Sequence, residues 1–264
     1  MTEQLDLNHK QASHNRPRLT VGILTLNEEK RIASCINSAT FADQILVIDS
    51  GSKDKTCDIA AALGAEVHDY PDWQGFAVQR NRVLKHAKGE YIFFLDADKE
   101  MPPEMQAEIE AVIASDKDEI WEVQWNQVAF GRALTRMKSG GSHHRMFKTQ
   151  SIREFSGLVH EKAEMHRGQQ PVNRFKARLL HYSRDTVYGS LSKLAQYTRL
   201  GAAKRAQAGK TGGVLRGLAS GGLLFVRFYI LRRGFLCGAE GFLFCLFVAL
   251  ESFFSLCGVE IRCD

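Results

Sequence analysis

The stretch KGEYIFFLDADKE (88–100) decides the fold, because its apolar run, YIFFL (91–95), passes directly into a pair of carboxylates. A short apolar run bounded by a glycine and by polar residues predicts a strand that is buried on both faces, as in a parallel sheet. Two similar runs precede it, LTVGIL (19–24) and ILVI (45–48), and helical patterns separate them. Strands that alternate with helices predict βαβ units and therefore an α/β fold with a mostly parallel sheet.

The helical patterns share apolar residues at helical spacing. The first lies at 32–39, and the second runs through 59–63 and ends at Gly64. The third lies at 74–87, where one face holds Phe76, Ala77, Val83, Leu84 and Ala87. From 120 to 182 the pattern changes to WEVQWNQV, HHRMFK, GLVHEKAEM and ARLLHYS, which predict antiparallel strands that extend the same sheet. After Asp185 the chain is predicted to be helical. The first of these helices covers 188–205, and two apolar segments follow it.

The composition excludes several protein classes. The chain has 264 residues, of which 44% are hydrophobic and 25% charged, so a disordered chain, a collagen-like repeat and a disulfide-stapled miniprotein are excluded. The six cysteines form no CxxC pair, which argues against a zinc site and favours reduced thiols in the cytosol. We predict a disordered tail at 1–17 without the apolar segment of a secretory signal, a catalytic α/β domain at 18–185, and a helical region at 186–264.

The charge is distributed unevenly along the chain. Residues 1–185 carry 25 basic and 26 acidic side chains, whereas residues 186–264 carry 10 and 4. A basic and apolar segment favours a membrane surface over nucleic acid, for which the sequence has no motif. Uncharged runs in this segment, such as Gly241–Leu250, fall short of the ~20 residues of a membrane span. We therefore predict amphipathic helices in the membrane plane. The alternatives are a tilted span interrupted by Glu251 and a buried helix pair that packs on the main domain.

Three polar clusters follow the predicted strands: TLNEE (25–29), DSGSKDKT (49–56) and DADKE (96–100). Ligands of parallel α/β sheets bind at the carboxyl ends of the strands. A single carboxylate there can also be a helix cap. Three clusters at one edge indicate a binding site.

DADKE is the most specific cluster. In an extended segment Asp96 and Asp98 project to the same side, where their carboxylates repel each other unless a cation lies between them. Oxygen ligands suit Mg²⁺ or Mn²⁺, and the chain has no P-loop or GxGxxG motif that could hold a diphosphate otherwise. We predict that these aspartates have no other cationic partner nearby and that turnover requires the metal. The alternative is a solvated turn before a helix.

Two further residues are candidates for ligand binding. Asp49 follows ILVI, where its carboxylate could accept a hydrogen bond from a base or a ribose, or cap the helix that starts near 54–56. Arg80 lies on the apolar face of the predicted helix 74–87, flanked by Asn81 and Arg82. A buried arginine needs an anionic ligand or an acidic cluster, and the alternative is a side chain that reaches solvent.

The motifs TLNEE, VIDSGSKDKT and QRNRVLKHAKGEYIFFLDAD, in this order within 19–100, resemble the inverting family 2 glycosyltransferases, which have the GT-A fold. GLVHEK, LLHYS, KLAQYTRLGAAKR and RRGFLCGAEGF are similar to the branch that builds the lipopolysaccharide core. The resemblance implies a peripheral enzyme on the cytoplasmic face of the bacterial inner membrane. It also implies transfer of glucose from UDP-glucose to an inner-core heptose of lipid A-core, with Mg²⁺ or Mn²⁺.

The resemblance also implies residue roles. Glu161 would be the catalytic base, and Asp96 and Asp98 would bind the metal. The donor nucleotide would be bound by Thr25, Leu26, Asn27, Glu28, Asp49, Ser50, Arg80, Asn81, Asp96 and Ala97. The sequence departs from the pattern at Lys99, where an acidic residue is commoner, and at Cys237, where we expect aspartate.

The reaction requires few groups. A divalent cation stabilises the departing diphosphate, and one carboxylate takes the proton of a hydroxyl that attacks from the opposite face, which inverts the anomeric centre. His160 is an alternative base, and His181 is a candidate metal ligand or core residue. Glu161 could instead be a surface residue that pairs with Lys162 or Lys148.

Two other functions stay open. A polyprenyl-phosphate sugar synthase would use an acceptor phosphate that is already ionised and needs no base. The non-enzyme alternative is an inactive membrane scaffold that binds nucleotide sugars, against which the intact DAD and HE motifs argue.

Overall fold

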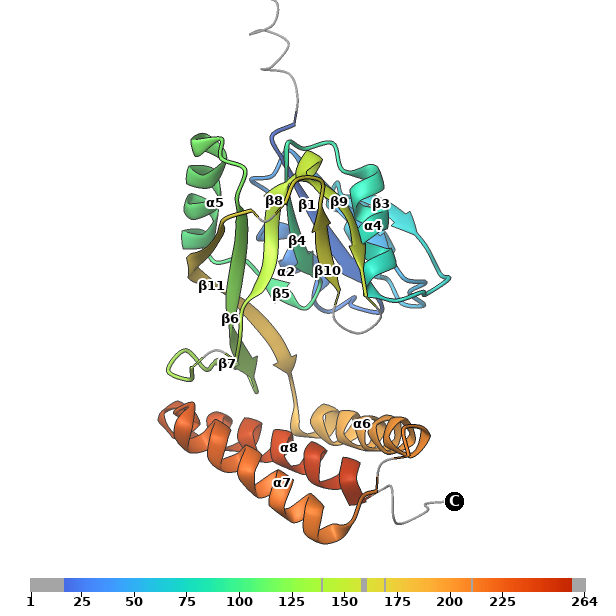
Figure 1. The fold of residues 1–264 in the computed structure, drawn as a ribbon, viewed down its shortest axis with the longest axis vertical. Coiled ribbons are helices and arrows are strands. Elements are labelled where there is room, and N and C mark those ends of the chain that lie inside the picture. The colour runs from blue at the N-terminus through green and yellow to red at the C-terminus, as the bar shows by residue number, and fades with distance from the viewer. Residues whose placement is uncertain (1–16, 139, 158–160, 169, 210, 258–264) are drawn as a thin grey trace, which may run out of the picture. The chain divides into compact units, whose positions relative to one another are not determined.

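The computed structural model describes residues 17–138, 140–157, 161–168, 170–209 and 211–257 (Figure 1). The predicted tail at 1–17 lies outside these residues except for Pro17. The chain divides into two compact units. The first runs to Gln124 and includes Gly141–Leu179, and the second comprises Trp125–Gly140 and the chain from Leu180 onward. The predicted domain boundary at 185 stays a prediction.

The first unit is built on the predicted parallel strands. β1 (Leu19–Thr25) lies between β2 (Gln44–Asp49) and β4 (Tyr91–Asp96), parallel to both, and β3 (Glu66–Asp69) is parallel to β2. Every residue of β1 is buried. The apolar runs therefore form strands covered on both faces, as the sequence predicts.

Antiparallel strands extend this sheet beyond β4. β8 (His143–Lys148) is antiparallel to β4 and to β6 (Ile120–Ala129). The full order is β3-β2-β1-β4-β8-β6-β11-β5, in which β11 covers Val172–Arg184 and β5 covers Lys99–Glu100. The prediction of antiparallel strands in the second half of the chain is confirmed here.

The described part of GLVHEKAEM after its first residue, 161–165, does not join the main sheet. β9 (Ile152–Ser156), which follows the 3₁₀ turn Thr149–Ser151, pairs with β10 (Lys162–Met165) in a separate two-stranded sheet. On one side of β9, Oδ1 of Asn81 accepts from the backbone N–H of Phe155 at 2.7 Å and Nδ2 donates to the carbonyl of Phe155 at 2.9 Å. These backbone groups are therefore bonded to a side chain and not to a further strand, while Phe155 pairs with Ala163 of β10 on its other side.

Four helices accompany the strands of the first unit: α2 (Ile32–Asn37), α3 (Thr56–Ala62), α4 (Phe76–His86) and α5 (Pro103–Ser115). α4 approaches β1 closely, because a Cβ on Gly22 would lie 2.2 Å from Cγ1 of Val83. Val83 and Ala77 are buried as predicted, but Phe76 is 49% exposed. Phe76 is the first residue of α4 and lines a cavity described below.

The second unit contains the C-terminal helices. α6 (Val187–Gln207) is followed by α7 (Val214–Val226), a π-helical turn (Arg227–Leu231), a 3₁₀ turn (Gly234–Cys237) and α8 (Gly238–Cys257), and a short strand, β7 (Arg132–Ala133), pairs with β6. α7 and α8 pack closely, since a Cβ on Gly221 would lie 3.0 Å from the carbonyl oxygen of Ala249. Cys237 is buried in this unit, beside Leu134 and Cys245.

The two last segments are apolar over the length of a membrane span. Val214–Leu231 has a mean hydropathy of 1.5, and 11% of its most apolar 18 residues is buried. Gly234–Cys257 has a mean hydropathy of 1.7, and 39% of its most apolar 18 residues is buried. Glu251, which interrupts the apolar run, accepts a hydrogen bond from Nη2 of Arg184 at 2.7 Å. Length and composition therefore allow spanning helices as well as the predicted helices in the membrane plane.

Candidate active site

Backbone hydrogen bonds join the polar clusters at the carboxyl ends of β1 and β2. The N–H of Asn27 donates to Oγ of Ser52 at 2.7 Å, and Oδ1 of Asn27 accepts from the N–H of Lys53 at 2.8 Å. Asn27 has a φ of +53°, which asparagine tolerates better than most residues and which turns the loop toward its neighbour. The N–H of Ser50 also donates to the carbonyl of Thr25. Two of the three predicted clusters therefore meet at this edge, and residues of the third, DADKE, line the cavity beside them.

A cavity of about 480 Å³ opens at this edge. It is lined by Leu24, Thr25, Leu26, Glu28, Ser50, Trp73, Phe76, Asp96, Ala97, Asp98 and Lys99. Oγ1 of Thr25 is buried without a hydrogen-bond partner in the described structure. A buried hydroxyl without a partner costs free energy, so this cavity offers a polar ligand a hydrogen bond.

Trp73 and Phe76 form an aromatic wall that the sequence reasoning missed. Their side chains are about half exposed, and their rings meet edge to face with centroids 5.0 Å apart. Exposed aromatic rings beside a polar cavity can stack on a planar base. The spacing WxxF at the start of a predicted helix was the available signal, but it is too common to be decisive.

Lys99 lies between the two aspartates of the DAD motif. Its Nζ is 2.8 Å from Oδ2 of Asp96 and 2.8 Å from Oδ1 of Asp98. The motif is also a turn, in which Ala97 and Asp98 follow the last residue of β4, and not the extended segment that we predicted. The prediction that these aspartates have no other cationic partner is wrong, because the turn brings the next side chain back between the two carboxylates.

Asp96 is paired with two further cations. Its Oδ2 accepts from Nη2 of Arg145 at 3.1 Å, and its Oδ1 lies 3.7 Å from Nη2 of Arg80. Burial alone would raise the pKa of Asp96, but Arg145, Lys99 and Arg80 together hold that pKa well below its ordinary value. The carboxylate therefore stays ionised, as a metal ligand must be.

Arg80 is the arginine that the sequence singled out, and of the alternatives left open for it the structure shows a buried side chain in contact with acidic residues. Its side chain is 2% exposed, and its Nε and Nη2 each lie 3.1 Å from Oε1 of Glu161. The guanidinium also lies 5.1 Å from the ring centroid of Phe94. Burial lowers the pKa of Arg80 to about 10, so it is charged at neutral pH. One guanidinium thus contacts both Asp96 and Glu161.

A second cavity of about 670 Å³ lies on the Glu161 side. Arg80, Arg145, Glu161, His143, His144 and Lys162 are among its lining residues. Nη1 of Arg80 and Nε of Arg145 are buried without hydrogen-bond partners in the described structure. Guanidinium N–H groups of this kind bind carboxylate or phosphate oxygens well.

Three predicted donor-binding residues do not line either cavity: Asn27, described above, Asp49 and Asn81. Asp49 is fully buried, and its Oδ2 accepts from the backbone N–H groups of Gly51 and Ser52 at 2.8 and 2.6 Å. The Asn81 amide is bonded to Phe155, as described above. All three residues hold loops beside the cavities, and direct ligand contact by any of them stays a prediction.

The histidines and lysines considered for the site have separate positions. His160 lies outside the described residues, and the ring of His181 packs edge to face on Trp125 within the second unit, with centroids 5.9 Å apart. Lys148 donates to Asp116 at 2.8 Å. The prediction that Glu161 could pair with Lys148 is wrong, because Arg80 is its partner.

The sequence model of glycosyl transferase family 2 matches residues 20–157, which is half of the chain. The chain belongs to this family. The match covers the cavity lined by the DAD motif, and the mixed sheet, parallel from β3 to β4 and antiparallel at β8 and β6, is the predicted GT-A-type α/β architecture. The chain is therefore a glycosyltransferase.

Full-length relatives carry related names. An uncharacterized glycosyltransferase of Rickettsia bellii is 27% identical over 250 residues, which cover 90% of this chain and 85% of the relative. The lipopolysaccharide core biosynthesis glycosyltransferase LpsC of Rhizobium meliloti is 26% identical over 257 residues, 92% of each chain. Among solved structures, S. aureus TarS 1-349 in complex with UDP-GlcNAc is 15% identical, with a TM-score of 0.47, over 89% of this chain and 81% of that chain.

Proposed function

We propose that this glycosyltransferase moves a hexose from a UDP-sugar, with glucose as the expected sugar, to an inner-core heptose of lipopolysaccharide. The Arg80 guanidinium carries this proposal, because it pairs with Asp96 of the donor cavity and with Glu161 of the neighbouring cavity. A donor and an acceptor that reacted here would meet at one charged centre. The similarity to LpsC over 92% of both chains supports the lipopolysaccharide acceptor.

The donor cavity suits a nucleotide diphosphate. Trp73 and Phe76 offer a stacking surface, Thr25 and Ser50 offer hydroxyls, and the DAD turn forms the far wall. Among the residues that the family resemblance implies, Thr25, Leu26, Glu28, Ser50, Asp96 and Ala97 line this cavity, whereas Asn27 and Asp49 shape the loops beside it.

The residues of the DAD turn fit a divalent cation. One oxygen of Asp96 and one of Asp98 each lie 2.8 Å from Nζ of Lys99. The two carboxylates are therefore close enough together to bind one small cation between them. Mg²⁺ or Mn²⁺ bound by them would stabilise charge on the departing diphosphate. The chain's own part is to keep Asp96 ionised through Arg145 and Arg80.

Glu161 is the proposed base. Its carboxylate is 20% exposed, lines the second cavity, and is held in place by two N–H groups of Arg80. An acceptor hydroxyl in this cavity would give its proton to a carboxylate that is already oriented. Attack from this side, opposite to the leaving diphosphate, would invert the anomeric centre.

A polyprenyl-phosphate acceptor is the second candidate. Arg80 and Arg145 line the second cavity and favour an acceptor that carries an anionic group. A phosphorylated heptose core and a lipid phosphate both have such a group. Purified enzyme offered a panel of UDP-sugars, with lipid A-core or with polyprenyl phosphate, separates these functions. Transfer of glucose to the core supports the proposal, and transfer to polyprenyl phosphate alone contradicts it.

Trp73→Ala is expected to weaken UDP binding by about 10-fold, because base–aromatic stacking contributes about 1–3 kcal/mol. The measurement is the dissociation constant of UDP for the variant and for the parent enzyme. Val172→Ala is the matched control, since this exposed residue lines the other cavity. Unchanged UDP affinity in Trp73→Ala would remove the aromatic wall from the donor site.

We further propose that the second unit binds the cytoplasmic face of the inner membrane. Its helices expose large apolar side chains, including Leu215 at 82% and Leu223 at 70%. Residues 186–264 also carry the basic excess of the chain. Apolar burial and attraction to anionic lipids would act together, whether the helices lie in the membrane or span it.

Leu215→Ser combined with Leu223→Ser is expected to weaken binding to anionic vesicles by about 10-fold or more, because burying each leucine contributes about 1.5–3 kcal/mol. Vesicle flotation measures the bound fraction. Leu63→Ser, at a 40% exposed leucine of the first unit, is the control and should bind like the parent. Truncation of α8 is a poorer test, since Phe244 and Cys245 pack against Ala129 and Leu134.

A further inference from the structure

Lys99 occupies a place in the donor cavity where a cation is expected. Its Nζ lies 2.8 Å from one oxygen of Asp96 and 2.8 Å from one oxygen of Asp98, and its side chain is 8% exposed. Burial alone would lower the pKa of Lys99, but the two aspartates raise it, so the ammonium is charged at neutral pH. The enzyme thus carries its own monovalent cation between the two carboxylates proposed to bind the metal.

The same carboxylate oxygens cannot accept hydrogen bonds from Lys99 and coordinate a divalent metal at the same time. A divalent cation takes oxygens at about 2.0–2.3 Å and repels an ammonium at hydrogen-bond distance from the same oxygens. Asp96 would keep its contacts with Arg145 and Arg80, but Asp98 would exchange one cation for another. Lys99 also lines the donor cavity, where a diphosphate would offer its ammonium new acceptors.

We infer that Lys99 holds the place of the divalent cation until the donor binds. This inference rests on the metal site of the proposed function and adds an order of binding to it. The metal displaces the ammonium, and the displaced ammonium is stabilised by the donor diphosphate. Metal and nucleotide therefore bind cooperatively, and the coupling is reciprocal.

Binding of Mn²⁺, followed by the loss of the free-ion electron paramagnetic resonance signal, tests this without turnover. For the parent enzyme we expect weak Mn²⁺ binding alone and binding tighter by at least about 10-fold with saturating UDP, on the scale typical of coupled sites. Lys99→Met keeps the length of the side chain and removes the charge. It should bind Mn²⁺ alone at least about 10-fold more tightly than the parent, with a smaller effect of UDP.

Lys53→Met is the matched control, because it removes the same charge from an exposed lysine at the same edge of the sheet. It should bind Mn²⁺ like the parent. The inference is overturned if Lys99→Met, still able to bind UDP, binds Mn²⁺ no more tightly than Lys53→Met. A parent enzyme that binds no Mn²⁺ even with saturating UDP, or that does not bind UDP, would contradict the proposed function instead.

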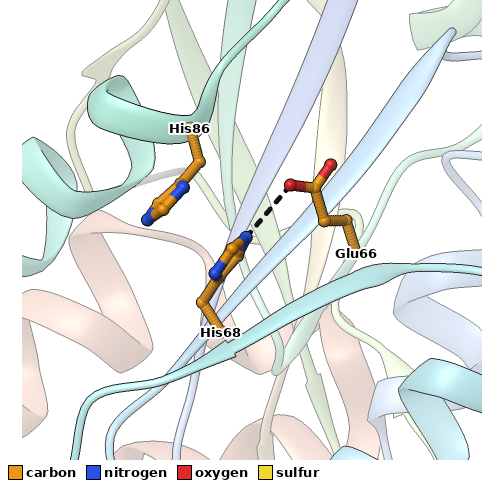
Figure 2. A group of neighbouring side chains, drawn as sticks. All are labelled: Glu66, His68 and His86. Atoms are coloured by element: carbon orange, nitrogen blue, oxygen red, sulfur yellow. Dashed lines mark hydrogen bonds and ion pairs between the residues drawn. The ribbon is translucent and has the colours of Figure 1, made fainter.

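A second, independent observation lies at the edge strand of the same sheet, away from the DAD turn. Glu66 and His68 are two residues apart on β3, so their side chains share a face, and His86 is the last residue of α4 (Figure 2). Nε2 of His68 lies 3.0 Å from Oε1 of Glu66, and the imidazole rings stack with centroids 3.7 Å apart. One ligand atom from each residue lies within 4.8 Å of the others.

The hydrogen bonds of these three side chains leave one possible ligand atom on each. Oε2 of Glu66 accepts from Lys88 and Gln44 at 2.7 and 2.9 Å, which turns Oε1 toward His68. The hydroxyl of Tyr70 lies 2.8 Å from Nε2 of His86, which leaves Nδ1 for another ligand. Hydrogen bonds to the second atom of a ligand are typical of metal sites, since they fix its orientation.

We propose that Glu66, His68 and His86 form a Zn²⁺ site that fastens the edge strand β3 to α4. Two nitrogen donors and one oxygen donor suit Zn²⁺ and distinguish this site from the oxygen-only DAD turn. The cysteine pattern argues against a cysteine zinc site, and these donors need no cysteine. Because the two imidazole rings stack, coordination of one ion by both requires the His86 ring to turn out of the stack.

Zn²⁺ titration of the full chain against a chromophoric chelator tests the site, in an Asp98→Asn background that weakens the other metal site. We expect one Zn²⁺ per chain and a rise of Tm with Zn²⁺. His68→Gln should bind Zn²⁺ at least about 100-fold more weakly, and Tyr70→Phe about 10-fold more weakly.

His166→Gln removes an exposed histidine of the same unit and should keep both the stoichiometry and the affinity. The proposal is overturned if the Asp98→Asn chain binds no Zn²⁺ at micromolar free concentration. Equal Zn²⁺ affinities of His68→Gln and His166→Gln would also overturn it. Sugar transfer by the parent enzyme does not depend on either result.

Discussion

Asp98→Asn is expected to lower kcat for sugar transfer by about 10²–10³-fold and to weaken Mn²⁺ binding. A metal at the leaving group contributes several kcal/mol to the transition state, and each 1.4 kcal/mol is tenfold in rate. The side chain is 32% exposed at the end of a turn, so its loss should leave the fold intact. Initial rates with UDP-glucose and lipid A-core, at several Mn²⁺ concentrations, measure the effect.

Asp58→Asn is the matched control, since it removes one exposed carboxylate from α3 of the same unit and should retain normal turnover. The thermal unfolding midpoint of both variants checks that neither has lost its fold. Full activity of Asp98→Asn, or of the parent enzyme in excess EDTA, would contradict a metal role for the DAD turn.

The sheet could be predicted because its strands are marked locally. The apolar runs of β1, β2 and β4 each end in a polar cluster, and parallel strands place those ends at one edge whatever the details of the loops. The two-stranded sheet of β9 and β10 could not be predicted, because the Asn81 amide that bonds the other side of β9 lies 74 residues earlier in the sequence.

The DAD turn shows the limit of periodicity. Spacing by two places Asp96 and Asp98 on one side only if the backbone is extended, and here Ala97 and Asp98 form a turn. The turn brings Lys99 back onto both carboxylates. Sequence identifies the unusual lysine, but only the backbone conformation shows what its ammonium contacts.

Contacts between distant parts of the chain complete the site. The need of Arg80 for an anionic partner follows from its place on an apolar helix face, but its partner, Glu161, lies 81 residues later. Arg145, which holds Asp96, gave no signal in the sequence, because a basic residue in a predicted strand is common. Such pairings depend on the tertiary fold and not on local spacing.

Glu161→Gln is expected to lower kcat by about 10²–10⁴-fold with little change in UDP-sugar affinity, which is the usual contribution of a general base. Glutamine keeps the size of the side chain and a carbonyl oxygen that can accept from the Arg80 N–H groups. The Arg80 contact to Asp96 should therefore persist, and only the ability to take a proton is removed. Single-turnover rates and donor binding are measured separately for the variant.

If Glu161→Gln still transfers sugar at a near-normal rate, the interpretation depends on which acceptor was used. A phosphate acceptor is already ionised, so near-normal transfer by Glu161→Gln to polyprenyl phosphate would favour the synthase. Near-normal transfer to lipid A-core, together with a large loss in His160→Ala, would assign the base to the histidine. Glu154→Gln, at an exposed glutamate of β9, controls for the loss of charge. A base role for Glu161 requires that its substitution, and not that of Glu154, slows transfer to the heptose hydroxyl.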